Sequence, residues 1–108
     1  MISASKILGK AKPAAGVNTT LLTVASGKQA EVTLFITNQG ANPDQIRVAL
    51  TRSGEVLSSP DYIAWDIPIT APGVFNATGI GLAQGDFVTI RSALGYCSFV
   101  ATGLEVTI

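Results

Sequence analysis

Few residues in this chain have side chains suited to catalysis, and none has the partners that catalysis needs. The sequence contains no histidine and a single cysteine, Cys97. Without histidine, a Ser-His-Asp or Cys-His arrangement is impossible within this sequence, and the commonest general base and metal ligand is missing. Cys97 lies in the segment GYCSFVATG, which has the composition of a strand. We therefore expect it to be a small buried side chain and not a nucleophile.

The carboxylates are also poorly placed for acid–base chemistry. Asp61 and Asp66 are five residues apart in one expected strand, an odd spacing that points them to opposite faces. Asp44, Glu55 and Asp86 sit in or beside turns, where an acidic side chain commonly caps its own backbone. The sequence thus predicts neither an enzyme nor a cofactor or metal site.

The elements that carry these residues are strands, and the clearest lies within LLTVASGKQAEVTLFITNQG, residues 21–40. Its second half alternates strictly: one face holds Ala30, Val32, Leu34 and Ile36, and the other holds Glu31, Thr33, Phe35 and Thr37. Alternation with a period of two predicts a strand with one face in a core. Phe35 falls on the face opposite the core, so we expect an interface to cover it.

Turn-forming clusters divide the rest of the chain into further short strands, expected over 5–12, 19–25, 45–52, 61–67, 74–82, 87–92 and 97–108. No window has a helical period. About eight strands at this spacing predict an all-β, single β-sandwich that is jelly-roll-like and antiparallel, with an immunoglobulin-like sandwich as the second choice. Pro68 predicts an edge strand or the end of pairing, and Gly103 a kink or bulge.

We expect one domain, because 108 residues are enough for a single core. Residues 19–108 form the expected sandwich, and residues 1–18 a basic N-terminal arm or an edge strand. All four lysines lie within the first 28 residues, where there is no acidic residue. Lys6, Lys10 and Lys12 fit either a solvated edge strand that discourages unwanted pairing or an arm that docks on an acidic patch.

The overall composition favours assembly. The chain is 47% hydrophobic and 13% charged, about half of the charged fraction of ~25% in ordinary soluble domains. A surface this poor in charge is expected to be partly hidden against other subunits. Four lysines without clustered arginines make a weak nucleic-acid footprint, so we expect no nucleic acid. Neither a membrane span nor a signal peptide is expected, which predicts folding in the cytoplasm.

The two large aromatic residues of DYIAWDI are expected on opposite faces of their strand. Trp65 is expected in the core beside Ile63 and Ile67, whereas Tyr62 is expected outside, as an anchor at a subunit contact or a platform on which a sugar stacks. The candidate interface residues are therefore Lys6, Lys10, Lys12, Phe35 and Tyr62.

Several motifs resemble a small β-module of tailed-phage virion structural proteins, such as those of cyanobacterial and marine phages. The strongest are Gly27-Lys28-Gln29-Ala30, Asn38-Gln39-Gly40 and Leu82-Ala83-Gln84-Gly85-Asp86, within a similarity that runs from about Thr19 to the C-terminus. These are turn motifs, so they specify a fold better than a role. Trp65 stands where the family usually has tyrosine, and Arg52 where it has proline.

The resemblance implies a structural component of a phage virion, found in tail fibres or the baseplate and assembled in the host bacterial cytoplasm. It implies a symmetric homo-oligomer, with a trimer favoured, that contacts other virion proteins. Two alternatives stay open. One is a capsid decoration protein that clamps local threefold sites through the basic N-terminal segment. The other is a carbohydrate-binding adhesion module that contacts host surface glycans through Tyr62 and loop acids.

Overall fold

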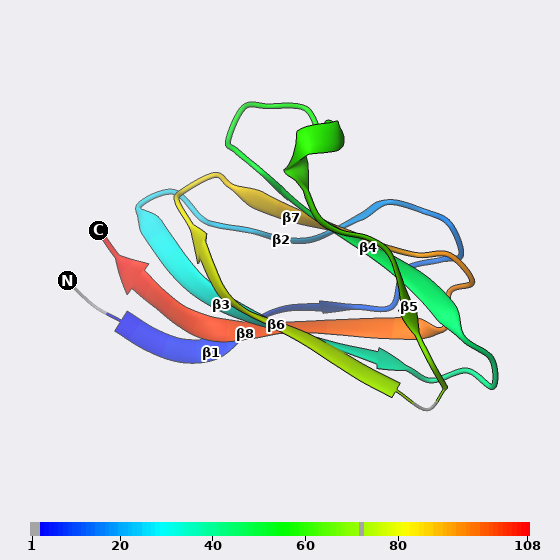
Figure 1. The fold of residues 1–108 in the computed structure, drawn as a ribbon. Coiled ribbons are helices and arrows are strands. Elements are labelled where there is room, and N and C mark those ends of the chain that lie inside the picture. The colour runs from blue at the N-terminus through cyan, green and yellow to red at the C-terminus, as the bar shows by residue number, and fades with distance from the viewer. Residues whose placement is uncertain (1–2, 72) are drawn as a thin grey trace.

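The computed structural model describes residues 3–71 and 73–108, which form eight β-strands and one short 3-10 turn (Figure 1). The elements are β1 (Ser3–Ala11), β2 (Thr19–Thr23), β3 (Lys28–Asn38), β4 (Asp44–Thr51), η1 (Ser59–Asp61), β5 (Tyr62–Ile69), β6 (Gly73–Leu82), β7 (Phe87–Ser92) and β8 (Cys97–Thr107).

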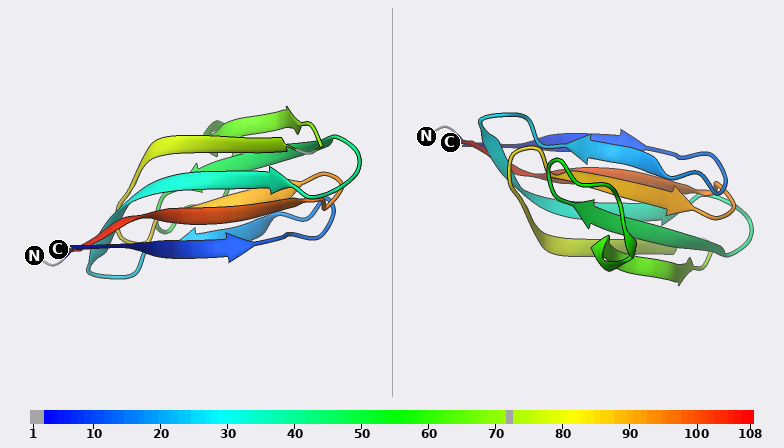
Figure 2. Two further views of the ribbon diagram at one scale, coloured as in Figure 1. Left: turned by 90° about the horizontal axis from the view of Figure 1, so that it is seen from below. Right: turned by 90° about the horizontal axis from the view of Figure 1, so that it is seen from above.

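The strands form two four-stranded antiparallel sheets packed face to face. One sheet has the order β1-β8-β3-β6 and the other β2-β7-β4-β5 (Figure 2). The antiparallel pairs β1–β8, β2–β7, β3–β6 and β4–β5 nest inside one another, as in a long hairpin rolled into two layers. This is the strand order of a jelly roll, and it confirms the predicted fold class.

The core lies between the sheets and is built from alternate residues. Ala30, Val32, Leu34 and Ile36 of β3 are buried, as their spacing predicted. They face Ile46 and Val48 of β4 and Val88 and Ile90 of β7 across the sandwich, and within their own sheet they lie beside Phe99 and Cys97 of β8. The interior of the sandwich is almost entirely aliphatic, so its stability comes from apolar burial.

Strand β1 lies at one edge of its sheet. Ser3–Ala11 pairs antiparallel with β8, from Ser3 opposite Val106 to Ala11 opposite Phe99, with an irregularity between Ile7 and Gly9. Residues 1–18 were expected to form either a basic arm or an edge strand. In the structure, residues 3–11 form an edge strand. Residues 12–18 lead from β1 into β2.

Asn38, at the end of β3, ties the two sheets together with its buried amide. Its Nδ2 donates to the carbonyl oxygens of Asn42 (3.0 Å) and Ile69 (2.9 Å), and its Oδ1 accepts from the backbone N–H of Gly40 at 2.8 Å. The Asn-Gln-Gly turn is thus held by the side chain of its own first residue, and the same side chain fixes the end of β5.

Asp44, at the start of β4, organises the turn between β7 and β8. Its buried carboxylate accepts hydrogen bonds from the Ser92 hydroxyl and from the backbone N–H groups of Leu94 at 2.9 Å and Tyr96 at 3.1 Å. Burial by itself raises the pKa of Asp44, but these bonds, with one from the Gln45 N–H, outweigh it and hold the pKa below its ordinary value.

At the opposite end of the sandwich, the motifs Gly27–Ala30 and Leu82–Asp86 meet. The N–H of Gly27 donates to the Gln84 side chain at 2.8 Å, and the backbones of Val24 and the β6–β7 turn exchange hydrogen bonds. Asp86 closes its own turn by accepting from the N–H of Ala83 at 2.9 Å. The motifs therefore form turns, as expected, and the hydrogen bonds between these turns join the two sheets.

Gly103 is not the bulge that the sequence suggested. It pairs in regular register with Lys6 of β1 and Val32 of β3 in the middle of β8. A Cβ at this position would collide with the carbonyl oxygen of Glu31. The glycine is required because the backbones of β8 and β3 approach closely there.

We predict that Gly103→Ala destabilises the fold by roughly 1–3 kcal/mol, because the added methyl group must push β3 away from β8. Equilibrium urea unfolding followed by circular dichroism measures the change. Gly81→Ala is the matched control, since a Cβ there meets nothing within 4 Å, and it should be neutral. Equal stability of the two variants would contradict the close approach.

The lowered pKa of Asp44 predicts acid sensitivity. Its contribution to stability is fully present above the ordinary carboxyl pKa of 3.8 and is lost as the pH falls through the lowered native value. Asp44→Asn should cost roughly 2 kcal/mol at neutral pH and flatten this acid limb of the stability curve. Thermal unfolding from pH 7 to pH 2 tests both effects, with the exposed Glu55→Gln as control. An unchanged acid limb in Asp44→Asn would rule out this origin.

Candidate interaction surfaces

The outer face of the β1-β8-β3-β6 sheet is unusually apolar. Residues paired across antiparallel strands share a face, and the register places Ile7, Phe35, Val74, Val100, Leu104 and Val106 on this one. Val74 is 70% exposed, Ile7 59% and Phe35 40%. Its remaining outward residues in the described chain are mainly serine, threonine, asparagine and glutamine, and the charged ones are Lys10 and Glu31. We call this surface the apolar face.

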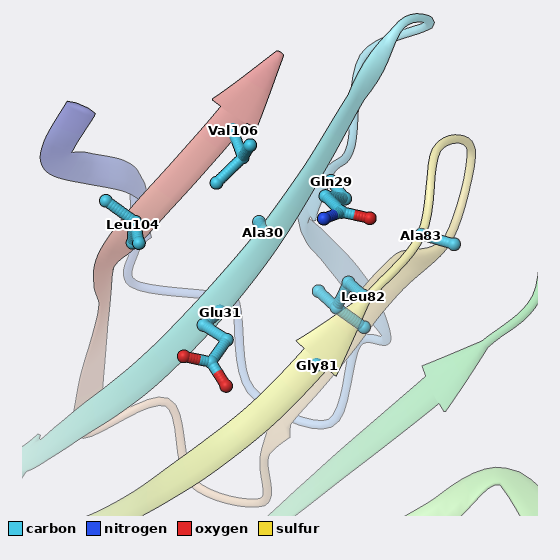
Figure 3. A pocket seen from close by; sticks show the side chains of 8 residues that line it. All are labelled: Gln29, Ala30, Glu31, Gly81, Leu82, Ala83, Leu104 and Val106. Atoms are coloured by element: carbon cyan, nitrogen blue, oxygen red, sulfur yellow. The ribbon is translucent and has the colours of Figure 1, made fainter. Parts of the chain in front are cut away.

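A shallow depression of about 480 Å³ lies at one end of the apolar face (Figure 3). Leu104 and Val106 of β8 bound it on one side, and β6 bounds it on the other, where Gly81 and Ala83 leave room. Glu31 and Gln29 of β3 project between them. The hollow is larger than any single side chain and has polar groups at its rim, so it suits several protruding side chains of a neighbouring subunit.

The three N-terminal lysines do not form one patch. Lys6 forms an ion pair with Glu105 at 2.8 Å, which lowers the pKa of that carboxyl. Lys10 lies opposite Val100 on the apolar face, and Lys12 is exposed just after β1. Their role at an interface stays a prediction. Their charges are distributed along the sheet edge.

The outer face of the second sheet is buried in part, near the end of β4. The segment 52–61, which includes η1, follows β4 on this side of the molecule (Figure 2). Ala49, Thr51 and Thr89 of the same sheet are buried. Thr51 donates its hydroxyl proton to Asp61 at 3.0 Å. The sheet stays open toward both of its edge strands, β2 and β5, and the large exposed side chains are on β5.

The sequence-based placement of Trp65 is wrong: the indole is 53% exposed on the outer side. The cause is a bulge in β5. Ile46 and Val48 are two residues apart on β4, but their partners Ile67 and Ala64 are three apart, so Trp65 and Asp66 together oppose Arg47. An extra residue reverses the alternation, so Ala64 points inward and Ile63, also expected in the core, is 50% exposed. Ile67 packs against the core, as predicted.

The bulge brings four side chains together outside the sheet: Arg47, Tyr62, Trp65 and Asp66, here called the aromatic platform. Arg47 bonds both carboxylate oxygens of Asp66, Nε to Oδ1 at 2.7 Å and Nη2 to Oδ2 at 3.2 Å. Its guanidinium carbon lies 3.6 Å from the centroid of the Trp65 ring. Tyr62 meets that ring edge to face, with centroids 4.7 Å apart.

These contacts stabilise the charged forms of both ionisable groups. The hydrogen bonds from Arg47 lower the pKa of Asp66, and the same bonds raise the pKa of Arg47. Asp66 is a carboxylate and Arg47 a cation throughout the neutral range, so the pair fixes the guanidinium over one face of the indole.

Sequence reasoning found Tyr62 but separated it from Trp65, and it missed Arg47 and Asp66. A signal was present in Asp66, because aspartate is rare within strands and tolerates the left-handed conformation. Asp66 adopts that conformation, with φ of 52°, as the one non-glycine residue at positive φ among the described residues. Pro68 marked the edge strand correctly, since β5 is at the sheet edge.

The single cysteine is buried in the core. Cys97 is fully buried, and burial raises its thiol pKa to about 11, so it is neither accessible nor nucleophilic at neutral pH. Residues 3–71 and 73–108 include no group of three histidine, cysteine or acidic side chains positioned around a common metal site. Nor does this part of the chain include a helix of the length and hydrophobicity needed to cross a membrane.

Comparison with known proteins adds no assignment: no family model matches the chain, and no curated protein shows significant similarity to it.

The exposed position of Trp65 has a direct optical consequence, because it is the single tryptophan in the sequence. The native protein should emit close to the wavelength of free tryptophan in water, and acrylamide should quench this emission efficiently. A blue-shifted emission protected from acrylamide would instead place Trp65 in the core and contradict the bulge. Emission in denaturant gives the fully exposed reference.

Proposed function

We propose that this chain is a structural subunit of a phage virion, a small oligomeric β-module of the tail fibre or baseplate whose apolar face packs against a second copy. The observation that carries the proposal is that face, which leaves Phe35, Val74 and Ile7 open to water beside only two charged side chains in the described residues. A monomer gains nothing from such a surface, which invites aggregation unless a partner covers it.

The size of the apolar face suits association with another copy. Four strands about 4.8 Å apart, each roughly ten residues long, cover roughly 600 Å² in projection, and side-chain relief increases the accessible area. A stable interface buries about 800 Å² on each partner. The net charge of zero adds no long-range repulsion between identical chains.

The resemblance to virion modules supports the same proposal. Its three turn motifs stand at the two ends of the sandwich, where they hold the sheets together. They leave the sheet faces free to differ between proteins, so an assembly role for the apolar face is compatible with a shared scaffold. The jelly roll is itself a frequent architecture of viral coat proteins.

Replacing Phe35 by lysine should dissociate the oligomer, because a charge at the centre of the apolar face must lose its hydration when the face is covered. We expect association weakened by at least roughly 2 kcal/mol, read by light scattering coupled to size exclusion across micromolar concentrations. The matched control is Val56→Lys, at a residue 87% exposed in the 52–61 segment. A monomeric wild-type chain in the same assay would contradict self-association.

The location in the virion needs a separate experiment. Gold-labelled antibody against this chain, applied to intact phage particles and viewed by electron microscopy, should mark the tail tip or fibres. Label spread over the head would replace the tail assignment by the capsid decoration alternative. Particles without any label, when the antibody recognises the purified chain, would contradict both.

A further inference from the structure

The geometry points to a second binding surface, independent of the apolar face: the aromatic platform binds a neutral pyranose sugar of a glycan, stacked on Trp65. The platform lies on the β2-β7-β4-β5 sheet, whereas the apolar face belongs to the opposite sheet. The oligomer can therefore use both at once. The set of residues differs from that expected from the sequence, because Trp65, Arg47 and Asp66 join Tyr62 and the loop acids do not.

The indole of Trp65 is held by two contacts and stays largely accessible. Arg47 stacks on the ring at 3.6 Å, and Tyr62 meets it at an interplanar angle of 88°. Trp65 remains 53% exposed, so these contacts leave much of it open to a ligand. Stacking on the guanidinium fixes the orientation of the ring, and Asp66 in turn fixes the guanidinium through two hydrogen bonds. A ligand thus meets a flat surface that is already ordered.

The chemistry of the platform matches a sugar ring. A pyranose has one face of C–H groups, which stacks on an aromatic face, and a rim of hydroxyls that need donors and acceptors. Two of the five N–H donors of Arg47 are used by Asp66, so three remain, and the Asp66 carboxylate keeps unused lone pairs. The charges of this pair balance each other, so the stacking surface itself has no net charge and suits a neutral sugar. Arg91, which lies opposite Arg47 on β7, adds one positive charge beside it.

The bulge in the backbone of β5 exposes the ring of Trp65. Regular alternation through the strand would have turned Trp65 inward, and the bulge prevents that at the expense of a left-handed aspartate. Strained backbone of this kind persists where the surrounding structure requires it, and bulges commonly re-aim a side chain at a binding site. The core gains no packing from the exposed indole.

A sugar fits the platform better than a protein does. A protein interface needs about 20 residues on each side, but Ala49, Thr51 and Thr89 beside the platform are already buried. Two register irregularities along β5 also disrupt the hydrogen-bonding edge that an added strand would need. Repetition of the platform in an oligomer multiplies weak single-site affinity.

The test uses the full chain and the single tryptophan as reporter. Oligosaccharides of glucose, galactose, mannose and N-acetylglucosamine are titrated while Trp65 emission is recorded, and a glycan array is probed with the same protein. We expect a saturable blue shift with at least one neutral sugar and array signal for glycans that carry it. The affinity is then measured by calorimetry, so that variants without tryptophan can be compared.

Trp65→Ala should weaken binding by about tenfold or more, and Asp66→Asn should weaken it while it retains the reporter and tolerates the left-handed backbone. Circular dichroism checks that each variant is folded. Val17→Ala is the matched control, because Val17 is an exposed apolar residue just before β2, at the sheet edge opposite β5. It should leave the affinity for the sugar unchanged.

Three results would overturn the proposal: no saturable change together with a blank array, affinity unchanged in Trp65→Ala, or binding confined to acidic glycans. None of these bears on the apolar face, because oligomer size and the Phe35→Lys variant test that face separately.

Discussion

Alternation along β3 is the constraint on which the other elements depend. β3 pairs with β8 on one side and β6 on the other, and its even-numbered residues from Ala30 to Ile36 form the centre of one wall of the core. Because successive side chains point to opposite faces, that register also fixes what is left outside. Phe35 and its neighbours on β8 and β6 must then face away from the core, and the apolar face follows from the same pairing that builds the interior.

The opposite sheet departs from this regularity at its edge. β5 carries extra residues relative to β4, and each extra residue changes which side chains point outward. The result is a protected edge, since a bulged strand pairs poorly with another chain. The same departure places Trp65 outside, next to Tyr62 and over Arg47. One local irregularity therefore serves both to close an edge and to display an aromatic ring.

Polar side chains hold the loops while the sheets are held by apolar packing. Asn38 and Asp44 are buried at one end, and each satisfies several backbone groups of turns distant in sequence. Among the described residues, no buried side-chain nitrogen or oxygen lacks a hydrogen-bond partner. This complete satisfaction allows a chain with few charges to fix its turns without costly buried groups. Because these hydrogen bonds hold the turns, the outer side chains of the sheets are not needed for that purpose and can contact a partner.

Local patterns in the amino-acid sequence were enough to predict the all-β class, the inward face of β3, the turn positions and the exposure of Phe35. A period of two and side chains that suit turns are properties of short segments, so they can be interpreted without knowledge of the partner strands. Pro68 indicated an edge for the same kind of reason, because its missing N–H belongs to that residue alone. The absence of histidine likewise limits the available chemistry whatever the fold.

The surroundings of Trp65, the role of Gly103 and the pairing of the basic N-terminal strand depend on the tertiary structure. Each involves a partner strand distant in sequence: β4 for the bulge, β3 for the close approach to Gly103, and β8 for the pairing of β1. A single extra residue in β5 reversed the faces that strict alternation predicted, because register is set by hydrogen bonds between strands and not by the pattern within one of them.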